Sequence, residues 1–138
     1  MLFRSELFEN NTWLTALKPD TQLNTIDPED VAKFAVAALR DPARFHGRGI
    51  DLVGERLTAV EMMEALSEAV GREITASFYT EEQIAQDIEK NPFIGASLFL
   101  RDGVKHVDAE NVKTWGIPMG TYREFLARER EAVQKTYN

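Results

Sequence analysis

The chain has 138 residues, no cysteine and a formal net charge of −7, from 16 basic and 23 acidic residues. This length suits a single domain, residues 1–138, with one hydrophobic core that requires no disulfide support. The lack of cysteine excludes thiolate catalysis and cysteine metal sites, and the acidic balance disfavours nucleic-acid and anionic-lipid partners, because phosphate binding requires a basic face.

The first third of the chain predicts a strand, a turn and a long helix. The apolar run from Leu2 to Phe8 is typical of a buried strand, and residues 18–20 predict a turn before an extended segment at 22–26. Asp27 is a suitable N-cap for a helix from Pro28 to Arg40, because its carboxylate can accept from free first-turn amides. An apolar stripe at helical spacing predicts the core-facing side of that helix: Val31, Phe34, Ala35, Ala38 and Leu39.

Two strands and a capped helix follow. Residues 50–54 and 74–79 alternate between apolar and polar positions, which predicts two short strands. Thr58 and Glu61 form a capping box, in which each side chain can bind the other residue's backbone amide. The helix that starts there should end at Gly71 in the left-handed conformation.

The last third predicts mainly helices. Thr80 and Gln83 form a second capping box, and the apolar run 93–100 after Pro92 favours a buried helix. A short helix should follow Asp108 and stop at Gly116, and a third capping box at Thr121 should open the final helix. With about half of the residues helical and three or four short strands, the pattern indicates a helix-rich α/β fold.

Five segments follow one another in a distinctive order: Phe8-Glu9-Asn10 with Arg4 upstream, Ile26 to Ala32, Gly49 to Gly54, Leu57-Thr58 with the helix to Gly71-Arg72, and Trp115 to Pro118. Taken in this order, they resemble the carboxyl-terminal half of the NmrA-like family, an atypical branch of the short-chain dehydrogenases and reductases. The resemblance implies a partial Rossmann-like domain with a small sheet of three to four strands, without the glycine-rich nucleotide-binding half. It also implies that Phe8, Glu9 and Asn10 line a substrate cleft, although a cap or turn after a strand is the simpler explanation of Asn10 and Asn11.

The chain lacks the motifs with which the wider superfamily performs redox chemistry. It contains no G-x-x-G-x-x-G or G-x-G-x-x-G loop, and Gly47-Arg48-Gly49 is the nearest approach. The Tyr-x-x-x-Lys pair is also missing, since Gln83 stands four residues after Tyr79 and Leu126 four residues after Tyr122. Full-length relatives bind NAD or NADP, but for this chain alone we expect no cofactor and no cofactor-binding residue.

Three residues are candidates for acid–base chemistry. They are His106 beside Asp102 or Asp108, His46 beside Asp41 or Asp51, and Tyr79 at the end of a predicted strand. Histidine titrates near neutral pH, but surface exposure is the simpler interpretation of both histidines, and partial burial in the core is the simpler interpretation of Tyr79. Two separated histidines provide too few ligands for a metal site.

Two functions are compatible with the sequence. One is a small-molecule or protein-binding regulatory module that resembles the substrate-side half of an NmrA-like protein and has no redox activity of its own. The other is a small cofactor-free isomerase, lyase or cyclase with its pocket at an oligomer interface. Because a nucleotide-binding half would cover apolar surface, we expect a homo-oligomer or a complementary Rossmann half as partner, in contact with Leu2 to Phe8 or with residues 93–100. Neither a membrane span nor a signal peptide is predicted, so we expect a cytoplasmic protein.

Overall fold

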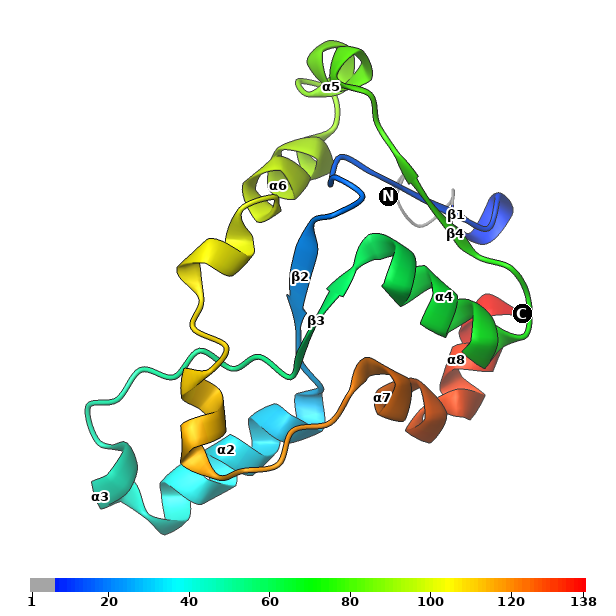
Figure 1. Cartoon of the computed structure of the whole chain (residues 1–138). Helices are drawn as coiled ribbons and strands as arrows, with labels where there is room; N and C mark the ends of the chain where they lie inside the picture. Colours follow the sequence, from blue (N-terminus) through cyan, green and yellow to red (C-terminus); the bar gives the residue numbers. More distant parts are fainter. Residues whose placement is uncertain (1–6) are drawn as a thin grey trace.

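The computed structural model describes residues 7–138 and places four short strands in two separate pairs (Figure 1). Strand β1 (Thr12–Thr15) pairs in parallel with β4 (Thr75–Phe78). Strand β2 (Gln22–Thr25) pairs in antiparallel fashion with β3 (Glu55–Thr58). The predicted helix-rich α/β class is confirmed, and the strands form two small sheets.

Helices occupy most of the remaining chain. They are α2 (Pro28–Arg40), α3 (Pro42–Phe45), α4 (Ala59–Val70), α5 (Glu81–Asp87), α6 (Pro92–Leu100), α7 (Tyr122–Arg128) and α8 (Arg130–Tyr137), with 3₁₀ turns η1 (Gly103–His106) and η2 (Asn111–Trp115). The N-cap at Asp27 and the three capping boxes, which begin at Thr58, Thr80 and Thr121, all form as predicted. The helix ends were predictable because a cap satisfies free amides within one turn of sequence.

The main core lies where α4 meets β4 and the two last helices. Figure 1 shows α4 beside α7 and α8, and each of these helices contacts it. Its buried members include Met63, Leu66, Val70, Ile74 and Leu126. A second, smaller cluster of Ala16, Ile84 and Ile94 lies under α6, with Tyr79 and Leu98 packed against it.

The strand predicted at residues 50–54 is wrong. Those residues lack regular structure, and the strand begins one residue later, at Glu55. The reason is the partner strand, because Gly54 N donates to Thr25 O at 2.7 Å and the antiparallel register then pairs Thr25 with Glu55. Residues 50–54, although they alternate between apolar and polar positions, therefore form the irregular segment that leads into β3.

The strand predicted from Leu2 to Phe8 lies largely outside the described residues. Its last two positions, Leu7 and Phe8, are helical together with Glu9. Leu7 is buried in the main core, and the Phe8 ring stacks on Tyr137 of α8 with 5.2 Å between ring centroids. The described part of this segment is therefore a helix end packed on α8, and its prediction as a strand is wrong there.

Two predicted core-facing surfaces are largely exposed. On α2, Phe34 is buried, but Val31 is 43% exposed and Leu39 is 83% exposed. Helix α6 forms as predicted, but only Ile94 is buried, and Phe99 is 80% exposed. Burial needs a facing element as well as an apolar stripe, and none of the described elements covers these surfaces.

The predicted final helix is divided in two. It is interrupted at Glu129, whose φ of −91° and ψ of 20° depart from helical values, and it continues as α8. This bend allows Leu126 of α7 and Val133 of α8 both to enter the core against α4.

Replacing Gly71 with alanine should destabilise the fold by about 1 kcal/mol, because Gly71 ends α4 at a φ of +82° that L-residues with a Cβ adopt at a cost. No atom lies within 4 Å of the added Cβ, so the loss reports backbone strain alone. The matched control is Gly95→Ala within α6, which also meets no atom and should stabilise the fold by about 0.5–1 kcal/mol. Urea unfolding measures both, and equal effects of the two variants would contradict the explanation.

Candidate ligand-binding site

A pocket of about 290 Å³ lies at the carboxyl ends of the two parallel strands. The strand ends are joined by a hydrogen bond from Tyr79 N to Thr15 O at 3.0 Å, and α6 forms the opposite wall. The lining consists of Trp13, Leu14, Thr15, Ala16, Tyr79, Asn91, Phe93, Ile94, Ala96, Ser97 and Leu100. In open α/β sheets, ligands bind at the carboxyl ends of parallel strands, so we refer to this cavity as the strand-end pocket.

The polar atoms of the strand-end pocket divide into those that are already bonded and those that are not. Thr15 Oγ1 accepts from Leu17 N, and Ser97 Oγ donates to Phe93 O. Asn91 caps α6, with its Oδ1 accepting from Phe93 N at 3.0 Å. Among the described residues, the Asn91 amide nitrogen and the Tyr79 hydroxyl have no hydrogen-bond partner, so both can donate to a ligand.

Arg101, a cation that is already ion-paired, contacts the backbone of the pocket residue Ala16. Arg101 Nε donates to Ala16 O at 2.7 Å, and its Nη1 forms an ion pair with Glu81 at 3.0 Å. The side chain of Arg101 is only 16% exposed, so it fixes the chain after β1 and is not itself part of the lining.

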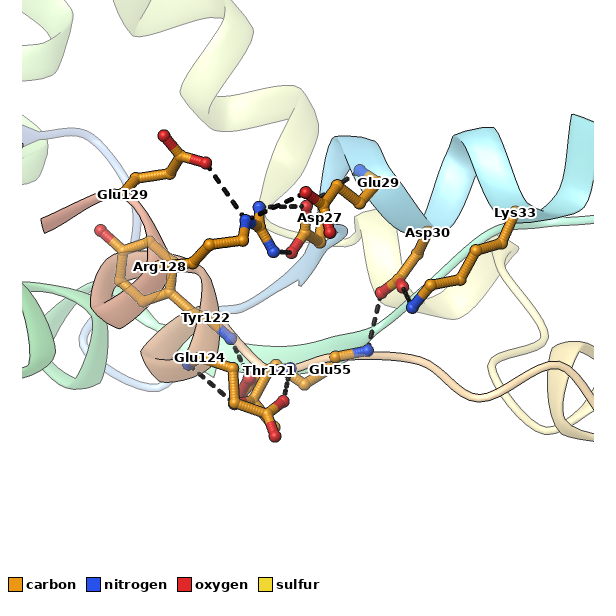
Figure 2. A network of polar contacts seen from close by, with 11 residues as sticks. Asp27, Glu29, Asp30, Lys33, Glu55, Thr121, Tyr122, Glu124, Arg128 and Glu129 are labelled. Carbon is orange, nitrogen blue, oxygen red and sulfur yellow. Dashed lines mark hydrogen bonds and ion pairs between the residues drawn. The ribbon is translucent and has the colours of Figure 1, made fainter. Parts of the chain in front are cut away.

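A second cavity, of about 300 Å³, lies at the start of α2 and is lined partly by Asp27, Met62, Tyr122 and Phe125. A network of carboxylates borders it (Figure 2). Three consecutive backbone amides each donate to a different carboxylate: Gly120 N to Asp30 at 2.7 Å, Thr121 N to Glu124 at 2.6 Å, and Tyr122 N to Glu55 at 2.6 Å. We call this arrangement, together with the Asp27–Arg128 ion pair, the carboxylate clamp.

The ion pair of the clamp is bidentate. Arg128 Nη1 and Nη2 donate to the two oxygens of Asp27 at 2.7 and 3.0 Å, as Figure 2 shows. The Arg128 hydrogen bond holds the pKa of Asp27 below its usual value, and the same contact raises the pKa of Arg128. Since its carboxylates are bonded to the protein itself, the clamp joins α7 to α2 and β3 and provides no free catalytic carboxylate pair.

Tyr122 should ionise late in an alkaline titration, because burial raises its pKa to about 12. A raised pKa means that folding favours the neutral phenol, so its contribution to stability is present below about pH 10 and is lost as the pH rises towards 12. Absorbance at 295 nm should show a late step near pH 12 that disappears in Tyr122→Phe, with circular dichroism confirming that the chain is still folded. Persistence of the late step in this variant would assign it to another tyrosine.

Of the three predicted catalytic candidates, Tyr79 lines the strand-end pocket and the two histidines do not. His46 and His106 are both exposed, and neither forms an ion pair with a carboxylate among the described residues. Asp102, the expected neighbour of His106, instead accepts from Lys105 at 2.5 Å, a bond that lowers the pKa of Asp102. The catalytic roles of these residues stay predictions.

The predicted substrate-lining residues lie at the other end of the parallel pair. Asn10 and Asn11 immediately precede β1, where Asn11 O accepts from Thr75 N at the amino end of β4. Asn11 also has a φ of +52°, which fits the predicted turn. Phe8, Glu9 and Asn10 are therefore separated from the strand-end pocket by the length of β1, and their role in substrate binding stays a prediction.

Sequence reasoning did not find Asn91 as a pocket residue, nor Asp30 and Arg128 as members of the clamp. The one available signal for Asn91 was the Asn-Pro pair that precedes α6, which indicates a cap and gives no hint of a cavity. Asp30 is 1% exposed, yet in sequence it is an ordinary acidic residue in a helical first turn.

These features define an α/β domain with a mostly apolar pocket at the carboxyl ends of a parallel strand pair. The chain matches the NmrA-like family over residues 2–114 and belongs to that family. It matches no curated protein. Among residues 7–138, no helix is long and apolar enough to span a membrane, and no group of three or more acidic or histidine side chains is placed to hold a metal ion.

Proposed function

We propose that this chain is a binding module, the substrate-side part of an NmrA-like protein, and that it holds a small molecule in the strand-end pocket. The observation that carries the proposal is the coincidence of an apolar cavity, two free donors and the carboxyl ends of parallel strands. We also propose that the module functions in the cytoplasm.

Binding is favoured over catalysis by the composition of the pocket. None of its lining residues is a histidine, a carboxylate or a lysine, and Tyr79 is the only one with an ionisable side chain. An isomerase or lyase moves a proton between two positioned groups, and the two histidines lie outside this cavity. The cofactor-free enzyme is therefore the less supported alternative.

The proposed module has no independent redox activity. Neither glycine-rich dinucleotide motif occurs in the printed sequence, and such a loop is what brings a pyrophosphate to a helix N-terminus. A thermal-shift titration should show no rise in melting temperature with NAD or NADP up to millimolar concentration. A rise of several degrees would contradict this part of the proposal.

Exposed apolar surface supports a protein partner for the module. Strands β1 and β4 pair only with each other among the described strands, whereas parallel sheets are normally larger and covered on both faces. Leu39 on α2 and Phe99 on α6 are each at least 80% exposed. We propose a second copy or a complementary Rossmann half as the partner, and light scattering that shows a monomer at high micromolar concentration, with such a half added, would contradict it.

The binding proposal is tested with indole as a neutral aromatic probe. In a ¹⁵N-correlated NMR titration, indole should shift the amides of Ala16, Tyr79 and Ser97, and Ala96→Trp should abolish these shifts by filling the pocket. The matched control is Ala132→Trp on the exposed surface of α8, which should leave them intact. Shifts elsewhere only, or shifts that survive Ala96→Trp, would exclude the strand-end pocket as the binding site.

A further inference from the structure

We infer that the exposed side of α2 is a self-association surface, on which α2 of a second copy of this chain packs in antiparallel orientation about a two-fold axis. The inference rests on the part of the proposed function that names a protein partner, because it assigns one surface and one occupant to that partner. The spacing of the exposed side chains, their charges and a groove beside the helix each support it.

The solvent side of α2 carries a seam of exposed side chains. Glu29, Ala32, Val36 and Leu39 follow one another at intervals of three, four and three residues, and all four are exposed. This spacing places them along one side of a helix, and we call them the α2 seam. Val36 and Leu39 are 44% and 83% exposed, whereas Asp30 and Phe34 of the same helix are buried. The helix therefore has one side packed on the protein and an apolar stripe on the other, which a further element can cover.

The charges of α2 favour a second copy of the chain as that element. Glu29 lies in the first turn of the helix and Arg40 in the last turn. An antiparallel pair of α2 helices about a two-fold axis therefore brings each Glu29 beside the Arg40 of the other copy, and this contact occurs twice. Within residues 7–138, Arg40 forms no ion pair, and Glu29 is 60% exposed and contacts only Arg128, through Oε1 at 3.2 Å. Both groups are therefore accessible to the second copy.

The residues near the two-fold axis permit close approach of the helices. Lys33 would lie near its own copy there, but its Nζ donates to Asp30 Oδ1 at 2.7 Å, so its charge is already neutralised. Ala32 of one copy would lie opposite Val36 of the other, and a small side chain facing a larger one allows two helices to interdigitate. The pairing therefore brings no unpaired like charges together at its centre.

The surface continues beyond the helix into an open groove. This groove has a volume of about 650 Å³ and runs along the same side of α2, with Ile117 and Pro118 as its other wall. Figure 1 shows the chain after η2 passing beside α2. The groove adds apolar contact to a helix that is only about 20 Å long. Since a contact of this length is small for a protein interface, we expect a reversible dimer with a Kd in the micromolar range.

Sedimentation equilibrium of the full chain at micromolar concentrations measures the dimer. Val36→Glu should weaken it at least about thirtyfold, because the variant places a carboxylate in the middle of the apolar seam. The matched control is Val31→Glu, because Val31 is 43% exposed on the same helix but lies outside the seam. The control should leave the dimer unchanged, and circular dichroism checks that both variants are folded.

The inferred ion pair is tested by exchanging charges between two variants. Arg40→Glu and Glu29→Lys should each weaken the dimer about tenfold, because two attractive pairs become repulsive. An equimolar mixture of the two variants should restore the wild-type affinity, since opposite charges then face each other at both ends of the mixed dimer. Only a contact that joins position 29 of one copy to position 40 of the other predicts this rescue.

The outcomes separate this surface from the small-molecule site. A wild-type chain that stays monomeric, a dimer that survives Val36→Glu, a mixture that associates no better than either variant, or association only with an added nucleotide-binding half would each overturn the inference. The indole titration decides the small-molecule site independently, because no residue of α2 lines the strand-end pocket. A chain that dimerises as described but shows no indole shifts would overturn the binding proposal and leave the α2 surface standing.

Discussion

Asp30→Ala should lower the free energy of unfolding by about 2 kcal/mol, which corresponds to a fall of roughly 6 °C in melting temperature. Asp30 is 1% exposed, and its Oδ2 accepts from Gly120 N at 2.7 Å. Removing the carboxylate leaves that amide without its partner inside the protein, which is more costly than losing a solvated hydrogen bond. Denaturant unfolding followed by circular dichroism measures the change.

Two matched variants show which contact of Asp30 accounts for the loss of stability in Asp30→Ala. Lys33→Met removes the exposed partner of Asp30 Oδ1 and should change the melting temperature little, because ion pairs with one solvated member contribute weakly. Asp30→Asn keeps an acceptor oxygen for Gly120 N and should lie between the wild type and Asp30→Ala. A large loss in Lys33→Met together with a small loss in Asp30→Ala would show that the ion pair is what matters.

Arg128→Met should lower the melting temperature at pH 7 by roughly 5 °C and flatten its dependence on acid pH. The Arg128 hydrogen bond lowers the pKa of Asp27 in the folded state. A lowered pKa contributes stability above the unfolded value, near pH 4, and this contribution is lost as the pH falls through the folded pKa. Wild type and variant should therefore differ most at neutral pH and converge below pH 3.

The control for this prediction is Arg130→Met, which removes a neighbouring arginine that has no ion pair among the described residues. Its melting temperature should follow the wild type at every pH. Scanning calorimetry between pH 7 and pH 2.5 supplies the comparison, and parallel wild-type and Arg128→Met curves would contradict the assigned role of the pair.

Short-range features of the fold were predictable from the sequence. The caps at Asp27, Thr58, Thr80 and Thr121 formed as expected because each depends on residues two or three positions away. Gly71 and Gly116 both adopt the left-handed conformation that ends a helix. The strand at 74–79 was also located correctly, since its alternation coincides with a partner strand of matching length.

Long-range features were not predictable. The hydrogen bond between Asp30 and Gly120 joins residues that are 90 positions apart, and the ion pair of Asp27 and Arg128 joins residues that are 101 positions apart. No local sequence pattern can therefore predict either contact. The strand at 50–54 was misplaced because register depends on β2, which lies far away in the sequence. The apolar stripe of α2 predicts the helix correctly but predicts the burial of Val31 and Leu39 wrongly. The spacing of apolar residues shows that they share one face of a helix, but it does not show whether another element covers that face.

The candidate site likewise depends on both short-range and long-range features. Tyr79 was a candidate because it ends a strand, but its pocket exists only where β1 and α6 meet it. Asn91 is a pocket residue because the N-cap of α6 and the end of β1 line the same cavity, and its local sequence does not indicate this.

The carboxylate clamp has a consequence for the order in which the protein is made. Asp27 and Asp30 leave the ribosome about ninety to a hundred residues before Gly120 and Arg128, the groups that bind them across the fold. Until then Asp27 and Asp30 have only partners that are close in sequence, namely the Glu29 amide and Lys33, and the start of α2 is not yet joined to α7. Folding during synthesis can therefore pair β2 with β3 and cap α2 first, while the junction between α2 and α7 closes only after Arg128 has been translated.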